Sequence, residues 1–189
     1  ARPDLTFPQT HADSSDIRVA HCPERVLPGQ VLRELKENNR VIGGMTPKCA
    51  EVAARLYKTF VQGNCVITDV RTAEMCKLTE NSFRDVNIAF ANELSLICDK
   101  EGINVWSLIQ LANRHPRVNI LQPGAGVGGH CIAVDPWFIV ARDPENAKLI
   151  RSARQVNNFK TAWVIEQIKG AVVDASARVG RKAKVACLG

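Results

Sequence analysis

Cys131 follows a glycine-rich segment and is the residue best suited to covalent chemistry. The segment 121–135 carries four glycines within positions 124–129. Glycine permits positive φ angles and close backbone approach, and successive amides in such a loop can form a concave anion site. A thiol after such a loop lies in an electropositive setting that favours the thiolate. We therefore predict that Cys131 is a nucleophile and that Asp135 orients a water or a cation. The alternative, non-catalytic interpretation is that the glycines form a flexible turn, that Cys131 is a buried thiol and that Asp135 caps a helix.

Three polar residues on a predicted long helix form a second candidate group. Lys77, Asn81 and Arg84 are four and three positions apart. At 100° per residue they fall within roughly 60° of one another, nearly opposite the apolar stripe of that helix. An ammonium, an amide and a guanidinium on one face would suit recognition of an oxyanion or a phosphate. A solvated helix face would show the same pattern.

Two shorter motifs add charged residues to the candidate sites. Glu24 and Arg25 come at the end of a predicted strand, within the run 22–26. Ligands bind outside the carboxyl ends of strands in open α/β sheets, so this pair is either part of a site or a surface ion pair. The basic run 113–117 precedes the glycine loop. It either binds a phosphate or is an exposed turn without a ligand.

The elements that must position these residues begin with a short α/β region. Apolar runs predict strands at 17–22, 40–44 and 65–68. Thr46 followed by Pro47 is a capping hydroxyl before a proline at the first helical position, and it predicts a helix that reaches about residue 62. These pieces look like the last strands and a helix of an α/β domain.

The rest of the chain is predicted to be helical. A stretch free of glycine and proline, from 72 to about 100, predicts a long amphipathic helix. Its near-heptad apolar stripe predicts packing against another helix or a second subunit. The stripe is formed by Phe83, Val86, Phe90, Leu94 and Ile97. Further helices are predicted at 105–113, from 135 onward and over about 144–177, followed by a basic linker and a strand near the end of the sequence.

Composition argues against a membrane protein and against a protein built on zinc sites or disulfides. Apolar residues make up 46% of the 189 positions, which is enough for a core, yet no apolar run approaches the roughly 18–20 residues that span a bilayer. Seven scattered cysteines without a Cys-x-x-Cys pair fit a reducing compartment and neither zinc nor a disulfide framework. We therefore expect a soluble cytoplasmic protein without a metal site or a membrane partner.

The charge of the chain fits a solvated basic surface, or an anionic small-molecule ligand such as a diphosphate, better than it fits nucleic acid. The formal net charge is +6, and aromatic residues make up only 5% without interleaving with basic ones. The sequence starts without methionine and stops where a strand, 184–188, meets a glycine. We therefore expect a central piece of a longer protein.

The motifs, in this order, resemble those of the UDP-glucose/GDP-mannose dehydrogenase family. The family's catalytic loop reads Pro-Gly-x-Gly-x-Gly-Gly-x-Cys-x-x-x-Asp, here 123–135, and its helix reads Lys-x-x-x-Asn-x-x-Arg, here 77–84. Its strand end reads Pro-Glu-Arg, here 23–25. The details of 114–120 and 129–138 look like the UDP-N-acetyl-D-mannosamine dehydrogenase branch.

The resemblance implies an α/β fragment made of parts of three domains. Residues 1–70 would be the C-terminal part of an NAD-binding Rossmann-like domain. Residues 71–178 would form a mainly α-helical central domain that dimerises and carries the cysteine loop. Residues 179–189 would be a linker and the first strand of a nucleotide-sugar-binding domain. The chain has no Gly-x-Gly-x-x-Gly after a strand, so the main NAD site is expected outside it, and the piece alone is expected to be inactive.

The resemblance also implies a mechanism, an NAD-dependent double oxidation of a sugar C6 alcohol through a thiohemiacetal and a thioester on Cys131. Lys77 and Asn81 would stabilise the oxyanion, Asp135 would support Lys77 or the hydrolytic water, and Glu24 would be the base for hydrolysis. The expected substrate contacts are Arg25, Val26, Arg84, His115, Arg117 and Gly126. The expected substrate is a UDP-sugar, UDP-N-acetylmannosamine first.

Two alternatives remain open at this point. One is a UDP-glucose or UDP-N-acetylglucosamine 6-dehydrogenase, since spacing does not fix the sugar. The other is a non-catalytic helical dimerisation module. A nucleic-acid-binding module is a more distant reading, and steep salt dependence of DNA binding would support it.

Overall fold

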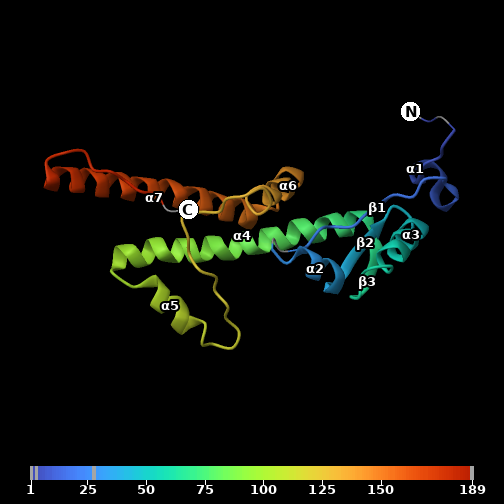
Figure 1. The fold of residues 1–189 in the computed structure, drawn as a ribbon, viewed down its shortest axis with the longest axis horizontal. Helices are drawn as coiled ribbons and strands as arrows, with labels where there is room; N and C mark the ends of the chain where they lie inside the picture. The colour runs from blue at the N-terminus through green and yellow to red at the C-terminus, as the bar shows by residue number, and fades with distance from the viewer. Residues whose placement is uncertain (1, 3, 27–28, 188–189) are drawn as a thin grey trace. The chain divides into compact units, whose positions relative to one another are not determined.

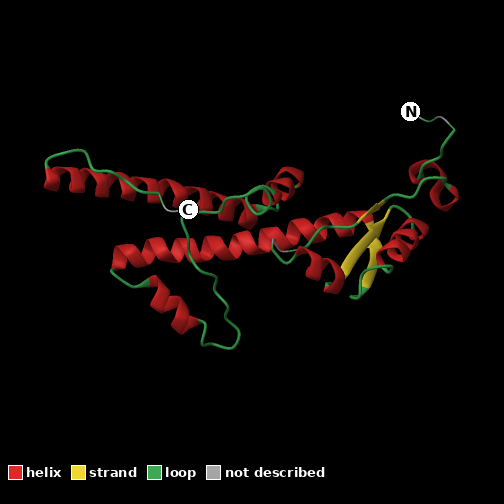
Figure 2. Cartoon of the chain, viewed as in Figure 1, coloured by secondary structure: helices red, strands yellow, loops and turns green. Residues whose placement is uncertain are grey.

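A computed structural model describes residues 2, 4–26 and 29–187, which fall into two compact units, Ala1–Glu80 and Asn81–Gly189 (Figure 1). The first unit holds a small sheet and the second is helical (Figure 2). The α/β class predicted from the sequence is confirmed. The elements of the first unit are α1 (Pro8–His11), the 3-10 turn η1 (Ala12–Ser14), β1 (Ala20–His21), α2 (Val31–Glu37), β2 (Arg40–Gly44), α3 (Pro47–Tyr57) and β3 (Cys65–Asp69). Helix α4 (Val70–Glu101) starts in the first unit, and α5 (Val105–Ala112), α6 (Asp135–Arg142) and α7 (Lys148–Val179) follow in the second.

The sheet has the order β1-β2-β3, with β2 and β3 parallel and β1 antiparallel to β2. The predicted strands at 40–44 and 65–68 are confirmed. The strand predicted over 17–22 is wrong in extent, because only Ala20 and His21 pair with β2. The carbonyl of Ile17 instead accepts the Ser15 hydroxyl at 2.9 Å, and its amide donates to the Thr6 carbonyl at 3.2 Å.

Helix α3 starts as its sequence predicts and ends early. The Thr46 hydroxyl accepts the Cys49 amide at 3.2 Å and Pro47 occupies the first turn, which leaves fewer amides without partners. The predicted end near residue 62 is wrong, because the helix stops at Tyr57. The Gln62 amide turns away to donate to the Lys36 carbonyl at the end of α2, at 2.6 Å.

The core of the first unit is small and mostly apolar. Ile42 of β2 is fully buried, and Ala50 and Ala54 of α3 are buried against the sheet side. Small side chains let the helix approach the strands closely, which burial of apolar surface then stabilises. On β3, Val66 and Ile67 remain about half exposed.

Helix α7 differs at both ends from its prediction over 144–177. It begins at Lys148 because Asp143 closes a turn through Asn146, whose side-chain nitrogen donates to the two carboxylate oxygens at 3.1 and 2.9 Å. It continues to Val179 and stops at Gly180, whose φ of 65° is left-handed. The strand predicted at 184–188 does not form over 184–187, and residue 188 lies outside the described residues. A lone strand has no neighbour to pair with.

Helix α4 confirms the long helix predicted between 72 and about 100. Within the single chain, large members of its apolar stripe stay exposed while polar residues of the same helix are buried. Phe83 and Phe90 of the apolar stripe are 68% and 54% exposed, whereas Asp85 and Asn92 are fully buried. No helix in the described part of the chain is both long and apolar enough to cross a bilayer.

Candidate active site

Cys131 lies in the turn that leads from the glycine loop into α6. Its carbonyl accepts the amides of Val134 and Asp135 at 3.1 and 2.8 Å, which closes the turn just before the helix begins. The Cys131 side chain is exposed. Among the loop glycines, Gly126 and Gly129 have φ angles of 138° and 87°, which only glycine adopts without strain. The loop therefore presents an accessible thiol on a backbone that other residues would distort.

Asn81 and Asp135, two of the predicted catalytic residues, are brought together by α4 and α6. The Asn81 side-chain nitrogen donates to a carboxylate oxygen of Asp135 at 2.6 Å. Asn81 is buried and Asp135 is half-buried, so the bond is shielded from water in part. Because Asp135 also binds the Cys131 carbonyl through its amide, the carboxamide of α4 is tied to the turn that carries the thiol.

The other two members of the predicted helix group differ in exposure. Lys77 is half-buried and Arg84 is exposed, and both belong to α4. The helix is continuous through these positions, so the predicted spacing of one turn between Lys77 and Asn81 is kept.

Glu24 is the centre of a small network in the first unit. One of its carboxylate oxygens accepts the amides of Arg25 and Val26 at 2.7 and 2.9 Å, and the Arg40 guanidinium at 3.2 Å. Partial burial alone would raise the pKa of the Glu24 carboxyl, but these donors together hold it below its ordinary value. Glu24 is therefore ionised at neutral pH and, with its side chain 60% exposed, can accept a proton from water.

Because β1 runs antiparallel to β2, the Glu24 network lies at the start of β2 rather than at its carboxyl end. The sequence placed Glu24 at the carboxyl ends of the strands. That expectation is wrong for β2, because β1 is antiparallel to it and Glu24 contacts Arg40, the first residue of β2. Arg40 was missed as a site residue because a single arginine at the start of an apolar strand carries no motif. It is 3% exposed and also donates to the carbonyl of Leu35 at 2.9 Å, which anchors it.

Arg25 and Val26 are held in different ways. The Arg25 guanidinium forms an ion pair with the Glu80 carboxylate of α4 at 2.7 Å, and its Nε donates a hydrogen bond to the same carboxylate at 3.1 Å. Val26 is half-buried, and its amide is one of the donors to Glu24. The motif predicted as a surface ion pair or a site thus includes an ion pair, but with Glu80 as the partner of Arg25.

His115 and Arg117 lie on a short loop after α5, and both are exposed. The Arg117 amide donates to Nδ1 of His115 at 3.3 Å. The loop is closed by Asn113, whose side chain both donates to the Ile120 carbonyl, at 2.9 Å, and accepts its amide, at 2.7 Å. Asn113 was missed as an organising residue, although its place at the helix end was a signal.

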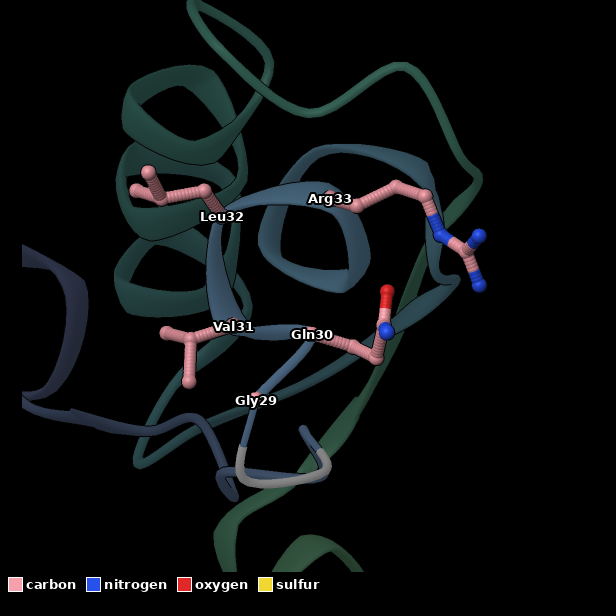
Figure 3. Close-up of a pocket in the computed structure, with 5 residues that line it drawn as sticks. All are labelled: Gly29, Gln30, Val31, Leu32 and Arg33. Atoms are coloured by element: carbon pink, nitrogen blue, oxygen red, sulfur yellow. The ribbon is translucent and has the colours of Figure 1, made fainter.

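A shallow depression at the start of α2 is separate from these residues. It is lined by Gly29 and the four residues that follow it (Figure 3). Val31 and Leu32 point to one side of it and Gln30 and Arg33 to the other (Figure 3). No predicted site residue lines this depression, so it enters no step below. The described residues also contain no cluster of three or more histidine, cysteine or acidic side chains that would hold a metal.

Two family models match the chain. The NAD binding domain of the UDP-glucose/GDP-mannose dehydrogenase family matches residues 5–61, and the central domain of the same family matches residues 71–159. Together they account for most of the sequence and include every predicted site residue.

Individual relatives are similar over the full length of the chain. UDP-N-acetyl-D-mannosamine dehydrogenase from Escherichia coli K12 is 68% identical over 191 residues, covering 100% of this chain and 46% of the relative. NDP-N-acetyl-D-galactosaminuronic acid dehydrogenase from Ralstonia nicotianae is also 68% identical, over 188 residues, covering 100% of this chain and 43% of the relative. The chain thus spans less than half the length of these proteins.

A solved structure shows the same fold. The UDP-N-acetyl-mannosamine dehydrogenase Cap5O from Staphylococcus aureus superimposes with a TM-score of 0.76 at 59% identity, over 85% of this chain and 38% of that one.

Proposed function

The chain belongs to the UDP-glucose/GDP-mannose dehydrogenase family, and we propose that the whole protein oxidises the C6 alcohol of a UDP-N-acetylhexosamine twice, to the uronic acid, with NAD as the oxidant. The observation that carries the proposal is the 2.6 Å hydrogen bond that ties Asn81 to Asp135 beside the Cys131 turn. It joins the helix motif, through Asn81, to the loop motif that carries both Asp135 and Cys131.

Cys131 supplies the nucleophile. After the first oxidation has turned the alcohol into an aldehyde, the thiolate adds to the aldehyde carbon and gives a thiohemiacetal. Loss of a second hydride and of the hydroxyl proton leaves a thioester, and attack of water releases the acid and restores the thiol. A covalent intermediate of this kind divides one difficult oxidation into easier steps. The exposed side chain of Cys131 allows a sugar to reach it.

Asn81 and Lys77 stabilise negative charge on the C6 oxygen in this proposal. The Asn81 amide is fixed by Asp135, so its donor needs no reorganisation as charge develops. We assign to Lys77 the movement of protons on and off the substrate oxygen. Asp135 acts by positioning Asn81, and by supporting Lys77 or the hydrolytic water.

Glu24 is the proposed base for thioester hydrolysis. The lowered pKa keeps it ionised, which a base requires, but also makes it a weak one. Arg40 and the two neighbouring amides bind one of its oxygens. The carboxylate is thereby held in one orientation.

Half of the proposed substrate contacts are arginines, and one is a glycine. Arginine forks suit phosphate oxygens, and a residue without a side chain admits close approach. These contacts are Arg25, Val26, Arg84, His115, Arg117 and Gly126.

No residue of this chain is assigned to NAD. The turn from β2 to α3 is glycine-bearing, but a Cβ at Gly44 would lie 2.4 Å from the Ala50 amide nitrogen and from the Thr46 carbonyl. The space that would admit a pyrophosphate is thus filled by the start of α3, and Thr46 caps that helix itself. These residues do not fit a pyrophosphate cradle.

We propose that the protein is a homodimer in the cytoplasm. Phe83, Phe90 and Ile97 of α4 are each more than half exposed, at seven-residue spacing, which is the pattern of a helix–helix seam. The cysteines are all free thiols, which fits a reducing compartment.

The sugar of the substrate is inferred from the names of the relatives. Relatives named for N-acetylmannosamine and for N-acetylgalactosaminuronic acid match equally well, at 68%. We favour UDP-N-acetylmannosamine because the solved relative at 59% identity is named for it. UDP-N-acetylgalactosamine is the second candidate.

The test is the yield of NADH per sugar in the full-length protein, with both substrates beside UDP-glucose and UDP-N-acetylglucosamine. About two NADH per UDP-N-acetylmannosamine, and faster turnover of it than of the others, would support the proposal. A yield near one would contradict the double oxidation, and a preference for another sugar would reassign the substrate.

A further inference from the structure

We propose that Asn92 and Asn157, two buried asparagines without a role in the reaction above, are positioning residues that fix the cysteine loop. The inference rests on the proposed function for its effect on turnover, but not for its effect on the loop. Asn92 lies on α4 and Asn157 on α7, and both are at most 1% exposed.

Asn92 binds the loop directly. Its side-chain oxygen accepts the Gly124 amide at 2.8 Å, at the start of the glycine-rich stretch. Its side-chain nitrogen donates to the side-chain oxygen of Asn157 at 2.9 Å. The carboxamide thus connects the loop with the neighbouring helix.

A chain of donors and acceptors fixes the orientation of both carboxamides. The Arg154 guanidinium donates to the Asp85 carboxylate at 2.6 Å, and the side-chain nitrogen of Asn157 donates to the same oxygen at 2.8 Å. Because Asp85 only accepts, Asn157 must turn its oxygen toward Asn92. Asn92 must then turn its nitrogen toward Asn157, which leaves its oxygen for the Gly124 amide.

The loop is tied to α4 at two points. Asn81 holds Asp135 and Asn92 holds Gly124. Eleven positions separate the two asparagines on the helix, and eleven separate Gly124 from Asp135 along the loop. Eleven helical residues span about 16 Å, whereas eleven extended loop residues can reach roughly 36–40 Å. The loop between the anchors is therefore slack, and two anchors alone would not fix the thiol between them.

Gly126 gives a third point, on α7. A Cβ at this position would meet the Thr161 hydroxyl oxygen at 2.0 Å and the Asn157 carbonyl at 3.4 Å. The backbone of the loop thus packs directly on the helical turn that begins at Asn157. Loss of the Asn157 side chain would release the orientation of Asn92 and the first anchor together.

The test compares Asn157→Ala with Ser95→Ala in the full-length protein. Ser95 is a matched control because its hydroxyl accepts Lys160 at 2.8 Å, another buried hydrogen bond between α4 and α7 that does not touch the loop. The same hydroxyl donates only to the backbone carbonyl of Asn92, at 2.6 Å, so the variant leaves the Asn92 carboxamide and its partners in place. Both variants should lose thermal stability. Only Asn157→Ala should speed amide hydrogen exchange in the peptide 121–131, by about tenfold for one lost hydrogen bond.

Turnover separates positioning from packing. Asn157→Ala should lower kcat by about 10- to 100-fold, as small misplacements of a reacting group do, with KM for the sugar within about threefold, and Ser95→Ala should keep kcat. Equal exchange and equal kcat in the two variants would overturn the proposal. Faster exchange without any turnover in the parent protein would leave the loop anchor standing and count against the proposed function instead.

A second pair of variants, both at Gly124, tests the same anchor if Asn157→Ala does not fold. Gly124→Pro removes the amide donated to Asn92 without altering either helix, and Gly124→Ala keeps it in open space, with the nearest atom 3.9 Å from the added Cβ. Faster exchange over the rest of the loop in the proline variant alone would support the anchor. Equal exchange in the two would contradict it.

Discussion

In the sheet unit the most buried side chains are apolar or small, such as Ile42 and Ala50, whereas in the helical unit Asp85, Asn92 and Asn157 are buried to the same degree. Apolar contacts are non-directional, so they stabilise many similar packings. A buried polar network is satisfied in one arrangement only, because each unpaired group is costly. We therefore expect the helical unit to tolerate fewer core substitutions than the sheet unit, because its buried hydrogen bonds hold the helices that carry the loop in one arrangement.

The ion pair within the network should have the largest effect on stability. Arg154→Met leaves the Asp85 carboxylate buried without its guanidinium, which should cost about 3–5 kcal/mol of unfolding free energy in urea titrations. Replacing both residues by apolar ones should restore much of that loss. The matched control is Glu166→Gln, which breaks the exposed pair with Lys169 and should change little. Equal losses in the two variants would contradict the comparison.

The apolar side of α4 should matter for assembly more than for folding. Phe90→Gln should weaken a dimer by about 100-fold or more in sedimentation velocity, since each copy loses a large buried ring, and should leave the unfolding midpoint of the monomer unchanged. An unchanged dimer with a lowered midpoint would show instead that Phe90 packs within its own chain. Lys100→Gln, near the end of the same helix, serves as the control.

Substitutions at Gly126 and Gly128 compare a packed glycine of the loop with an unpacked one. Gly126→Ala combines a φ of 138° with a clash against Thr161 and should lower the unfolding free energy by about 1–3 kcal/mol. Gly128 has no atom within 4 Å of an added Cβ and no left-handed φ, so Gly128→Ala should be neutral. Thermal unfolding of the two variants checks this, and equal midpoints would mean that the loop does not dock on α7.

Glu24 should show the smallest effect, because its side chain is mostly exposed. Its folded pKa is lowered, so its stabilisation is present above the ordinary pKa of a glutamate and is lost as the pH falls through the lowered value. Wild type should therefore exceed Glu24→Gln by less than about 1 kcal/mol at neutral pH, with no difference in strong acid. Urea titrations at the two pH values measure it. A difference that grows in acid would reverse the sign of the shift.

Much of the fold followed from local patterns, and the network did not. Strands at Arg40–Gly44 and Cys65–Asp69 were visible as apolar runs between breakers, and the Thr46-Pro47 pair marked the start of α3. The burial of Asp85 and Asn92 was not predicted, because their partners lie 69 and 65 residues away in the sequence. Periodicity predicted that the apolar stripe of α4 packs against another helix or a second subunit, and it gave no sign that polar residues of the same helix would pair within the chain.

The candidate site divides in the same way. Cys131, Asn81 and Asp135 were predicted as site residues from glycine spacing and helix periodicity, and the structure adds the hydrogen bond between Asn81 and Asp135. Arg40 and Asn157 were not found, because each acts through another side chain rather than through a motif. The antiparallel direction of β1 was also not visible, since an apolar run does not encode strand direction.

The covalent role of Cys131 is tested most directly by trapping its acyl intermediate. Full-length Glu24→Gln protein, in which hydrolysis should be slow, would be quenched in acid during turnover of UDP-N-acetylmannosamine with NAD and digested for mass spectrometry. We predict that the peptide containing Cys131 gains the mass of the nucleotide uronyl group and loses it with hydroxylamine, and that Cys131→Ser shows no adduct. Product formation at an undiminished rate with an unmodified Cys131 peptide, or an adduct on another cysteine, would contradict the account.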